Sequence, residues 1–459
     1  MLDYTYKQLE QAVRGKLMIP TRRTVFKGRV SLDSRTVQPG DLFIALKGKN
    51  FDGHDFIDLA FEKGARLCVA EMASSRKIRR RDPDIIFVES TSQAMCRLAG
   101  FHRRQKNKPL VAITGSCGKT TTKEILAHIL GAKYKVLKNA GTENNSVGVP
   151  KTLLNWDDED IAVIEIGTNQ IGEIHYLTRL VRPTHGILTL IGHSHLAGLR
   201  SIQGVRREKM SMLEAMDDTA TVIYNAEDRN IVHDRLKKLK SIRVGYKKTM
   251  NFYADQIHLL DHSIGFRLNG KTRIAAPILG QHNVLNILLA AGAASCFGIK
   301  PEDVKERMPS FEAPRGRLRY QESGGVHWID DSYNANPSSL KAAIELFRSY
   351  PPKGRKILVL GDMLELGPQA NAFHREAGQQ IAGYAFDLVL AVGSLAGRFA
   401  EEAVVSGFAK EKIKTFPSSI EAGEYLKSQL KPQDTILLKG SRGMKMERVM
   451  ETCGVRKVS

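Results

Sequence analysis

The stretch of residues 110–130 constrains the fold more than any other part of the sequence. Four apolar residues, Leu110–Ile113, precede the polar, glycine-containing segment TGSCGKTTTK at 114–123. Apolar residues then recur at the spacing of one helix face, at Ile125, Leu126, Ile129 and Leu130. A buried strand, a glycine turn and an amphipathic helix in this order predict a βα unit of a parallel sheet.

The turn in this unit has the chemistry of a phosphate-binding loop. Gly115 and Gly118 let backbone N–H groups turn toward a phosphate at the start of the helix. Lys119 is placed to reach the β- and γ-phosphates, and the Thr120 hydroxyl to bind Mg²⁺. The pattern is incomplete because Ile113 stands where a first glycine is usual. We predict ATP or GTP binding here rather than a purely structural turn. The predicted nucleotide-binding residues are Gly115, Ser116, Cys117, Gly118, Lys119, Thr120 and Thr121.

Two further apolar runs end in residues that suit catalysis. Ile161–Ile166 contains one acid, Glu165, and Gly186–Ile191 leads into a Gly-His-Ser-His segment that ends at His195. Ligands of parallel sheets bind beyond the carboxyl ends of the strands, so we expect Glu165, His195 and the phosphate loop on one rim. A carboxylate and an imidazole beside a magnesium nucleotide suit a second cation. The alternatives are an ion-paired acid and a helix-start histidine, and we expect His193 to be a loop residue.

The length and the punctuation of the chain indicate three domains. Its 459 residues exceed one ordinary domain. Boundaries are expected at Lys106–Pro109 and Ala313–Gly316. Beyond the second boundary, strand-like runs at 357–360, 388–392 and 435–438 alternate with helical stretches such as 340–347 and 418–430. We therefore predict an α/β fold with domains at 1–108, 109–317 and 318–459: a small α/β domain, a central parallel-sheet domain with the phosphate loop, and a Rossmann-like α/β domain.

The chain carries a large positive charge. Lys and Arg number 69 and Asp and Glu 49, a net charge of +20, of which +10 lies in residues 1–108. This excess suggests a polyanionic partner: nucleic acid, an anionic membrane surface or a phosphorylated substrate. The densest run, Arg76–Arg81, has no interleaved aromatic residues for base stacking. We interpret it and the basic residues of 103–108 as a solvated loop and linker, with no specific nucleic-acid partner.

Nothing in the sequence indicates secretion or a membrane span. Residues 1–20 mix charged with apolar residues and lack a signal-peptide core, and no long uncharged apolar run follows. The five cysteines form neither a disulfide framework nor a CxxC metal pattern. We expect a cytoplasmic monomer, with at most a weak association with an anionic membrane surface.

An ordered series of short motifs resembles the Mur ligases, the ATP-dependent amide ligases of peptidoglycan precursor synthesis. Each motif is short, but their order along nearly the whole chain is specific. The motifs DDSYNANP at 330–337 and GDMLELG at 361–367 point to the branch that adds D-alanyl-D-alanine. The full series comprises Asp33–Arg35, Pro39–Gly48, Phe51–Phe56, Thr114–Lys123, Gly141–Leu154, Glu165–Asn169, Gly172–Ile174, Ile191–Leu196, Gly280–Asn283, Gly316–Leu318, Asp330–Pro337, Gly361–Gly367 and Lys439–Arg442.

The resemblance implies domains for a UDP-sugar, for ATP and for an amine, in chain order. ATP would convert a carboxylate of UDP-N-acetylmuramoyl-tripeptide to an acyl phosphate, which the amine of D-alanyl-D-alanine attacks. The implied catalytic residues are Lys119, Glu165, His195 and Lys209, of which Glu165, His195 and Lys209 join Thr120 in holding Mg²⁺, with Lys209 as a carbamate. Asn283 would contact adenine, Arg317 the phosphates and Asp331 the ribose. Substrate-binding residues would be Ser34, Arg35, Lys47, Asn144, Asn145, Asn334, Asn336 and Arg442.

The sequence departs from the family pattern at five positions near this machinery. The family commonly has Asn where Cys117, Thr142 and Leu190 stand, and Glu where Ala197 and Ser211 stand. These departures leave open a Mur-type ligase that joins a different carboxylate and amine. A non-catalytic ATP-binding scaffold with a basic, polyanion-binding N-terminal face is a further alternative.

Overall fold

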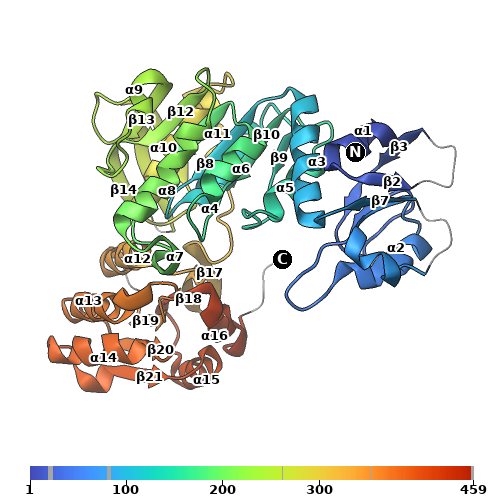
Figure 1. The fold of residues 1–459 in the computed structure, drawn as a ribbon. Coiled ribbons are helices and arrows are strands. Elements are labelled where there is room, and N and C mark those ends of the chain that lie inside the picture. The colour runs from blue at the N-terminus through green and yellow to red at the C-terminus, as the bar shows by residue number, and fades with distance from the viewer. Residues whose placement is uncertain (19–23, 80–83, 261, 352, 456–459) are drawn as a thin grey trace.

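In the computed structural model, the chain forms three α/β parts in sequence order (Figure 1). The structure describes residues 1–18, 24–79, 84–260, 262–351 and 353–455. Each part is built on its own sheet, and parallel strands dominate all three large sheets, which confirms the predicted fold class. No helix among the described residues is long and apolar enough to cross a membrane.

The N-terminal part pairs a small hairpin-like sheet with a five-stranded sheet. Strand β1 (Leu2–Thr5) pairs antiparallel with β3 (Val25–Gly28). The larger sheet has the order β2-β7-β6-β5-β4, parallel except for β2. Its strands are β2 (Lys16–Met18), β4 (Val30–Ser31), β5 (Leu42–Ile44), β6 (Leu67–Glu71) and β7 (Ile85–Val88). The helices are α1 (Tyr6–Val13), α2 (Ile57–Glu62) and α3 (Thr91–Lys106).

The middle part is built on a nine-stranded sheet with the order β16-β15-β14-β13-β12-β11-β8-β10-β9. Strands β8 to β14 pair in parallel, and β15 and β16 extend the sheet antiparallel. The strands are β8 (Leu110–Thr114), β9 (Val136–Lys138), β10 (Ile161–Glu165), β11 (His185–Leu188), β12 (Thr221–Asn225), β13 (Lys240–Gly245), β14 (Phe252–Leu260), β15 (Ser263–Leu268) and β16 (Thr272–Ala276). The helices are α4 (Lys119–Leu130), α5 (Gly148–Leu154), α6 (Glu173–Val181), α7 (Leu196–Leu199), α8 (Ile202–Ala215), α9 (Arg235–Lys238), α10 (His282–Ser295) and α11 (Pro301–Arg307).

The C-terminal part has a six-stranded sheet with the order β17-β18-β22-β19-β20-β21, parallel except for the edge strand β17. Its strands are β17 (Arg319–Ser323), β18 (Val326–Asp331), β19 (Lys356–Gly361), β20 (Leu388–Val392), β21 (Ile413–Phe416) and β22 (Thr435–Lys439). The helices are α12 (Pro337–Ser349), α13 (Ala370–Ala382), α14 (Ala396–Val405), α15 (Ser419–Gln429) and α16 (Glu447–Thr452).

The interpretation of residues 103–108 as solvated linker is wrong for its first residues. They form the last turn of α3, which packs on α5 and α6 of the middle part. Arg103 is buried, and its Nε donates to the carbonyl of Val181 at 2.8 Å. The expectation of a loop at 76–81 is wrong for Arg76 and Lys77, which end a 3-10 helix, Met72–Lys77. Arg80 and Arg81 lie outside the described residues.

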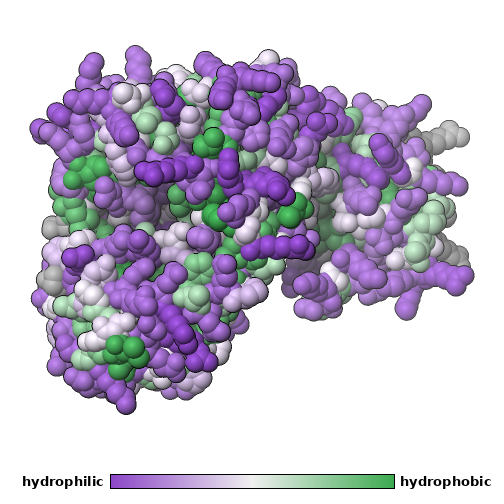
Figure 2. Space-filling model, turned by 60° about the vertical axis from the view of Figure 1, so that its left-hand side comes forward, coloured by the Kyte–Doolittle hydropathy of each residue, from purple (hydrophilic) through white to green (hydrophobic). Residues whose placement is uncertain are grey.

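Hydrophilic residues dominate the face of the molecule shown in Figure 2. On the face shown, a groove separates the N-terminal part from the C-terminal part, whereas the middle part touches both. Of the functional residues predicted from the sequence, Ser34, Arg35 and Lys47 lie in the N-terminal part, and the others lie in the middle and C-terminal parts.

Candidate active site

The phosphate loop lies at the switch point of the nine-stranded sheet. Strand β8 is flanked by β10 on one side and β11 on the other, so the chain leaves β8 into a crevice between diverging connections. Gly118, at φ +82°, caps the start of α4 in a left-handed conformation. A Cβ atom at Gly115 would lie 2.0 Å from the Thr189 hydroxyl, so only glycine fits there. The loop geometry thus presents the N-terminus of α4 to a phosphate, as its sequence predicts.

Oxygen ligands gather beside this loop. Thr120 Oγ1 donates to Glu165 Oε2 at 2.8 Å, and Asn144 Nδ2 donates to the other carboxylate oxygen at 2.7 Å. Lys119 folds back, with Nζ 3.0 Å from the Gly115 carbonyl oxygen. Burial lowers the pKa of Lys119, and the charge of Glu165 opposes this shift. The structure therefore brings together Thr120, Asn144 and Glu165 from three segments of the sequence, with Lys119 next to Thr120.

Lys209, on α8, is fully buried near the same cluster. Its Nζ makes no hydrogen bond within the described part of the chain. Burial, followed by the charge of Lys119, lowers its pKa to about 7. An amine of this pKa is substantially uncharged at neutral pH, which is the form that reacts as a nucleophile. In the described ranges, no three His, Cys, Asp or Glu side chains converge to hold a metal ion by themselves.

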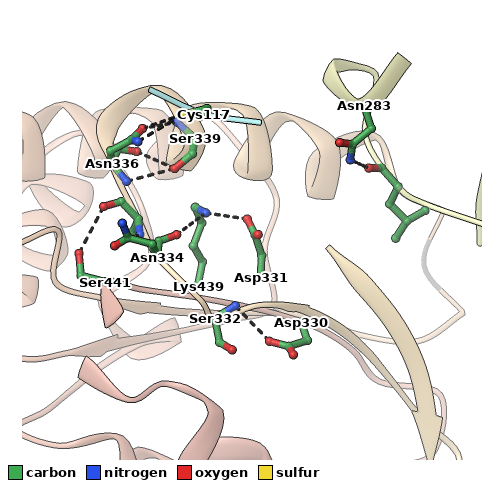
Figure 3. A network of polar contacts seen from close by, with 12 residues as sticks. Cys117, Asn283, Asp330, Asp331, Ser332, Asn334, Asn336, Ser339, Lys439 and Ser441 are labelled. Atoms are coloured by element: carbon green, nitrogen blue, oxygen red, sulfur yellow. Dashed lines mark hydrogen bonds and ion pairs between the residues drawn. The ribbon is translucent and has the colours of Figure 1, made fainter. Parts of the chain in front are cut away.

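The opposite wall comes from the carboxyl ends of the C-terminal sheet (Figure 3). Asp331 and Lys439 are direct partners in the register of β18 and β22, and Lys439 Nζ lies 2.6 Å from Asp331 Oδ2. The same Nζ donates to the Asn334 carbonyl at 3.0 Å. Burial raises the pKa of Asp331, and Lys439 opposes the rise. This buried pair fixes the start of the segment that carries Asn334 and Asn336.

The side-chain contacts that cross from the middle part to the C-terminal part include three polar ones. Cys117 Sγ lies 3.3 Å from Asn336 Nδ2, the Thr142 hydroxyl bonds to the Tyr333 hydroxyl, and His195 Nδ1 lies 2.9 Å from Glu365 Oε2. His195 lowers the pKa of Glu365. Three non-glycine residues here adopt positive φ, namely His195 (52°), Leu318 (54°) and Glu365 (63°). Such conformations cost energy and are concentrated at functional sites.

These elements enclose a cavity of about 400 Å³ between the two parts. Most of the predicted nucleotide, metal and C-terminal substrate residues line it. They are Ser116, Cys117, Gly118, Lys119, Thr120, Thr121, Asn144, Glu165, His195, Asn283, Arg317, Asp331, Asn334, Asn336 and Arg442. Asn283 lines the cavity while its amide nitrogen donates to the Leu279 carbonyl at 2.6 Å (Figure 3).

The remaining predicted residues are not brought to this cavity. Ser34, Arg35 and Lys47 belong to the N-terminal part. Arg35, highly exposed, pairs with Asp33 at 2.7 Å, whereas Ser34 is buried. Asn145 accepts from the backbone N–H of Val147 and Gly148 and so organises the start of α5. Neither these four residues nor Gly115 and Lys209 line the cavity described above.

Three residues that shape the cavity have no role predicted from the sequence. Tyr333, Glu365 and Lys439 all stand inside motifs quoted for the resemblance, so the motifs marked their neighbourhood. Their contacts cross between segments far apart in the chain, as with Thr142 and Tyr333, and no local pattern specifies such partners.

The comparisons with known proteins agree with this architecture. Sequence models of the Mur ligase family match the chain in three consecutive stretches: the catalytic domain at residues 28–103, the middle domain at 113–294 and the glutamate ligase domain at 316–442. The chain belongs to the Mur ligase family.

Individual relatives resemble the chain over almost its whole length. UDP-N-acetylmuramoyl-tripeptide–D-alanyl-D-alanine ligase of Bacillus subtilis is 34% identical over 98% of both chains. A crystal structure of MurF from Acinetobacter baumannii is 31% identical, with a TM-score of 0.88, over 99% of this chain and 100% of that one. MurF ligase from Thermotoga maritima, solved in complex with ADP, is 27% identical, with a TM-score of 0.82, over 93% of this chain and 97% of that one.

Proposed function

We propose that this Mur ligase is an ATP-dependent ligase that joins D-alanyl-D-alanine to UDP-N-acetylmuramoyl-tripeptide in peptidoglycan precursor synthesis. The observation that carries the proposal is the single cavity that joins the phosphate loop to the Asn334–Asn336 segment and Arg442. Relatives named for this reaction match 98% of the chain, which supports the choice of substrates.

The three parts divide the substrates among them in this proposal. Residues 1–108 hold the UDP-sugar, with Ser34, Arg35 and Lys47 as contacts. Residues 109–317 bind ATP, and residues 318–459 bind the dipeptide. Each segment contains one large sheet, which supports these bounds. The position of the cavity between the second and third segments supports the meeting of ATP and amine there.

The first step of the reaction depends on neutralising the negative charge of the transferred phosphoryl group rather than on acid–base catalysis. A carboxylate oxygen of the tripeptide attacks the γ-phosphorus of ATP, which forms an acyl phosphate and releases ADP. Lys119 and Arg317 offset the negative charge that develops on the transferred group. The dipeptide amine then attacks the acyl carbon, and the tetrahedral intermediate collapses with loss of inorganic phosphate and a proton. Asn334, Asn336 and Arg442 orient the dipeptide, so that much of the rate comes from positioning.

The residues present fit a magnesium ion beside the phosphate loop. The Thr120 hydroxyl and the Glu165 carboxylate are oxygen ligands of the kind that Mg²⁺ prefers, and they already lie 2.8 Å apart. Bound there with His195 nearby, the ion would neutralise phosphate charge. Asn144 orients the carboxylate through its hydrogen bond.

Lys209 contributes to this site as a carbamate in the proposal. An ammonium ion at this position would repel a cation, whereas its neutral amine adds CO₂ and loses a proton to give a carboxylate-like group. The buried Nζ, which has no hydrogen-bond partner among the described residues, and its lowered pKa both support this chemistry. The enzyme would act in the cytoplasm as a monomer, and the basic N-terminal part supports at most weak attraction to an anionic membrane surface.

A coupled assay tests the proposed function. The protein is mixed with ATP, Mg²⁺, UDP-N-acetylmuramoyl-tripeptide and D-alanyl-D-alanine, and both phosphate and the ligated product are measured. We expect phosphate release that depends on all three substrates and equals product formation. Turnover with another amine or another carboxylate, and none with this pair, would favour a Mur-type ligase of different specificity, which the departures at Thr142 and Cys117 leave open.

A further inference from the structure

The side chain of Tyr333 stands between two cavities. The second cavity, of about 330 Å³, lies on the C-terminal part and is lined by Arg315, Arg319 and Met450, among others. Tyr333 and Arg442 line both this cavity and the one that holds the phosphate loop. Tyr333 thus forms part of the wall that closes the proposed reaction chamber on its C-terminal side.

The ring of Tyr333 supports Arg317. The guanidinium carbon of Arg317 lies 4.2 Å from the ring centroid, in a cation–π contact. Within the described ranges, the Arg317 guanidinium makes no hydrogen bond or ion pair, yet its charge acts on both Lys119 and Asp331. Because an aromatic face uses none of the guanidinium N–H groups, Arg317 keeps all its donors for an anion.

The hydroxyl of Tyr333 reaches the middle part, where it bonds to the hydroxyl of Thr142. Thr142 lies in a loop that Lys123 anchors, with Nζ 2.7 Å from the Asn139 carbonyl and 2.6 Å from the Gly141 carbonyl. Two residues beyond Thr142, Asn144 orients Glu165. One hydroxyl therefore links the C-terminal part to the loop that sets the proposed metal ligand.

The backbone around Tyr333 leaves the ring little freedom. The backbone N–H of Tyr333 donates to the Gly316 carbonyl at 3.2 Å. Gly316 has a φ of +68°, and a Cβ atom there would lie 2.7 Å from the nitrogen and 2.8 Å from the Cβ of Tyr333. This close fit fixes the start of the side chain, while Arg317 and Thr142 fix its face and its tip.

We propose that Tyr333 is a positioning residue of the ligation reaction. Its ring holds Arg317 toward the phosphates without occupying the donors, and its hydroxyl locks the 139–144 loop when the C-terminal part is docked. The chamber that protects the acyl phosphate from water is thereby complete only in the docked arrangement. This inference rests on the proposed function, because it assigns Tyr333 a part in that reaction.

Two single-atom changes and their combination test the proposal. Tyr333→Phe removes only the hydroxyl, and Thr142→Val removes its partner with little change of shape. We expect each to lower kcat about 3–10-fold, the effect of one lost hydrogen bond, with the KM for ATP unchanged. The double variant is expected to be no worse than either single variant, since both remove the same contact. Phosphate release would outrun product formation in all three, because water reaches the acyl phosphate.

A third variant and a control separate positioning from folding. Tyr333→Leu also removes the face that supports Arg317 and is expected to raise the KM for ATP about 5-fold beyond Tyr333→Phe. Tyr320→Phe is the control, since it removes a tyrosine hydroxyl bonded to His327 in the same part, and Tyr320 lines neither cavity. It is expected to keep wild-type kcat and a matched ratio of phosphate to product.

The outcomes distinguish this inference from the proposed function. A wild-type enzyme that ligates, together with Tyr333→Phe and Thr142→Val variants of wild-type kcat and matched phosphate release, would overturn the positioning role alone. Additive losses in the double variant would also overturn it. A wild-type protein that neither releases phosphate nor forms product would overturn the proposed function and this inference with it.

Discussion

The two junctions between parts of this protein use arginine in opposite ways. At the junction of the N-terminal and middle parts, Arg103 is buried, lies 5.2 Å from the Trp156 ring, and donates to the carbonyls of Val181 and Arg182 at 2.8 and 3.1 Å. At the junction of the middle and C-terminal parts, Arg317 also lies over an aromatic ring, but within the described ranges its guanidinium has no hydrogen-bond partner. Arg103 donates two hydrogen bonds to the protein, whereas Arg317 keeps its donors available to a ligand.

The surroundings of the two arginines also differ: the polar groups near Arg103 are paired, whereas Arg317 lies beside a cavity. Around Arg103, the neighbouring His102 is buried too, and its Nε2 lies 2.8 Å from the Trp156 carbonyl oxygen, so the junction is packed and its polar groups are paired. Around Arg317 lies a cavity of about 400 Å³ with residues held at positive φ. A junction that is satisfied internally serves stability, and one with unsatisfied donors around a cavity serves binding.

The largest effect is expected from a substitution at Lys119, which lines the cavity at the second junction. Lys119→Ala removes the cation beside the transferred phosphoryl group, and we expect product formation to fall about 10²–10³-fold. The melting temperature should stay close to that of the wild type, because within the described ranges the Lys119 side chain makes a single hydrogen bond, to the Gly115 carbonyl. Phosphate release and a thermal melt measure the two quantities. Unimpaired turnover would mean that the phosphate loop is not the site of ATP chemistry.

Lys209 should rank next. Lys209→Arg keeps a cation but does not form a carbamate, and we expect activity to fall about 100-fold, as for other groups that hold a metal or its ligands. In the wild type, the pKa of about 7 predicts activity that rises with pH through neutrality, because only the amine deprotonated above this pKa adds CO₂. The rise should be steeper without bicarbonate and shallower with it. A pH profile independent of bicarbonate would argue against the carbamate.

Most of the fold could be predicted from the sequence, whereas the contrast between the two junctions could be predicted only in part. The alternation of strands and glycine turns predicted parallel α/β sheets, and the run from Leu110 to Lys123 predicted the βα unit that became β8 and α4. The local pattern was enough for this unit, because the apolar run, the glycine turn and the apolar helix face follow one another directly in the sequence. The ring contacts of Arg103 and Arg317 could not be predicted in this way, since Trp156 and Tyr333 belong to other segments of the chain.

Helix α3 shows where the charge pattern misleads. The basic residues of 103–108 look like a solvated linker, because buried arginine is rare without a carboxylate partner. Here the carbonyls at the end of α6 replace the carboxylate and accept from Arg103. Free carbonyls at a helix C-terminus attract cations, so the partner is a feature of the backbone that no side-chain pattern reveals.

A substitution at the junction of the N-terminal and middle parts should lower the stability of the protein and leave its catalysis unchanged. Arg103→Met keeps much of the apolar stem but removes two hydrogen bonds from a charged donor, and we expect a loss of about 2–3 kcal/mol in the free energy of unfolding. Urea denaturation measures this loss, and the KM for ATP of the folded variant should match that of the wild type. Arg104→Met, on the same helix but exposed, is the matched control and should change the stability little. Equal stabilities of the two variants would show that Arg103 is not a structural residue.

The smallest effect, and the sharpest test of the second junction, is expected at Glu365. Glu365→Gln removes the charge opposite His195 but leaves the backbone bond from Ala197 N–H to the Glu365 carbonyl, 3.0 Å long, so the loop remains docked. The Glu365 side chain is 60% exposed, and an exposed ion pair is worth at most about 1 kcal/mol, so kcat should fall less than about 5-fold. Salt should lower the wild-type rate toward that of the variant, since it screens the same charge. Glu401→Gln, which breaks an exposed pair with Arg398 in the same part, should have no such effect. If Glu365→Gln lowered kcat as much as Lys119→Ala, the ion pair of His195 and Glu365 would take part in the reaction itself. The second junction would then differ from the first in its histidine as well as in its arginine.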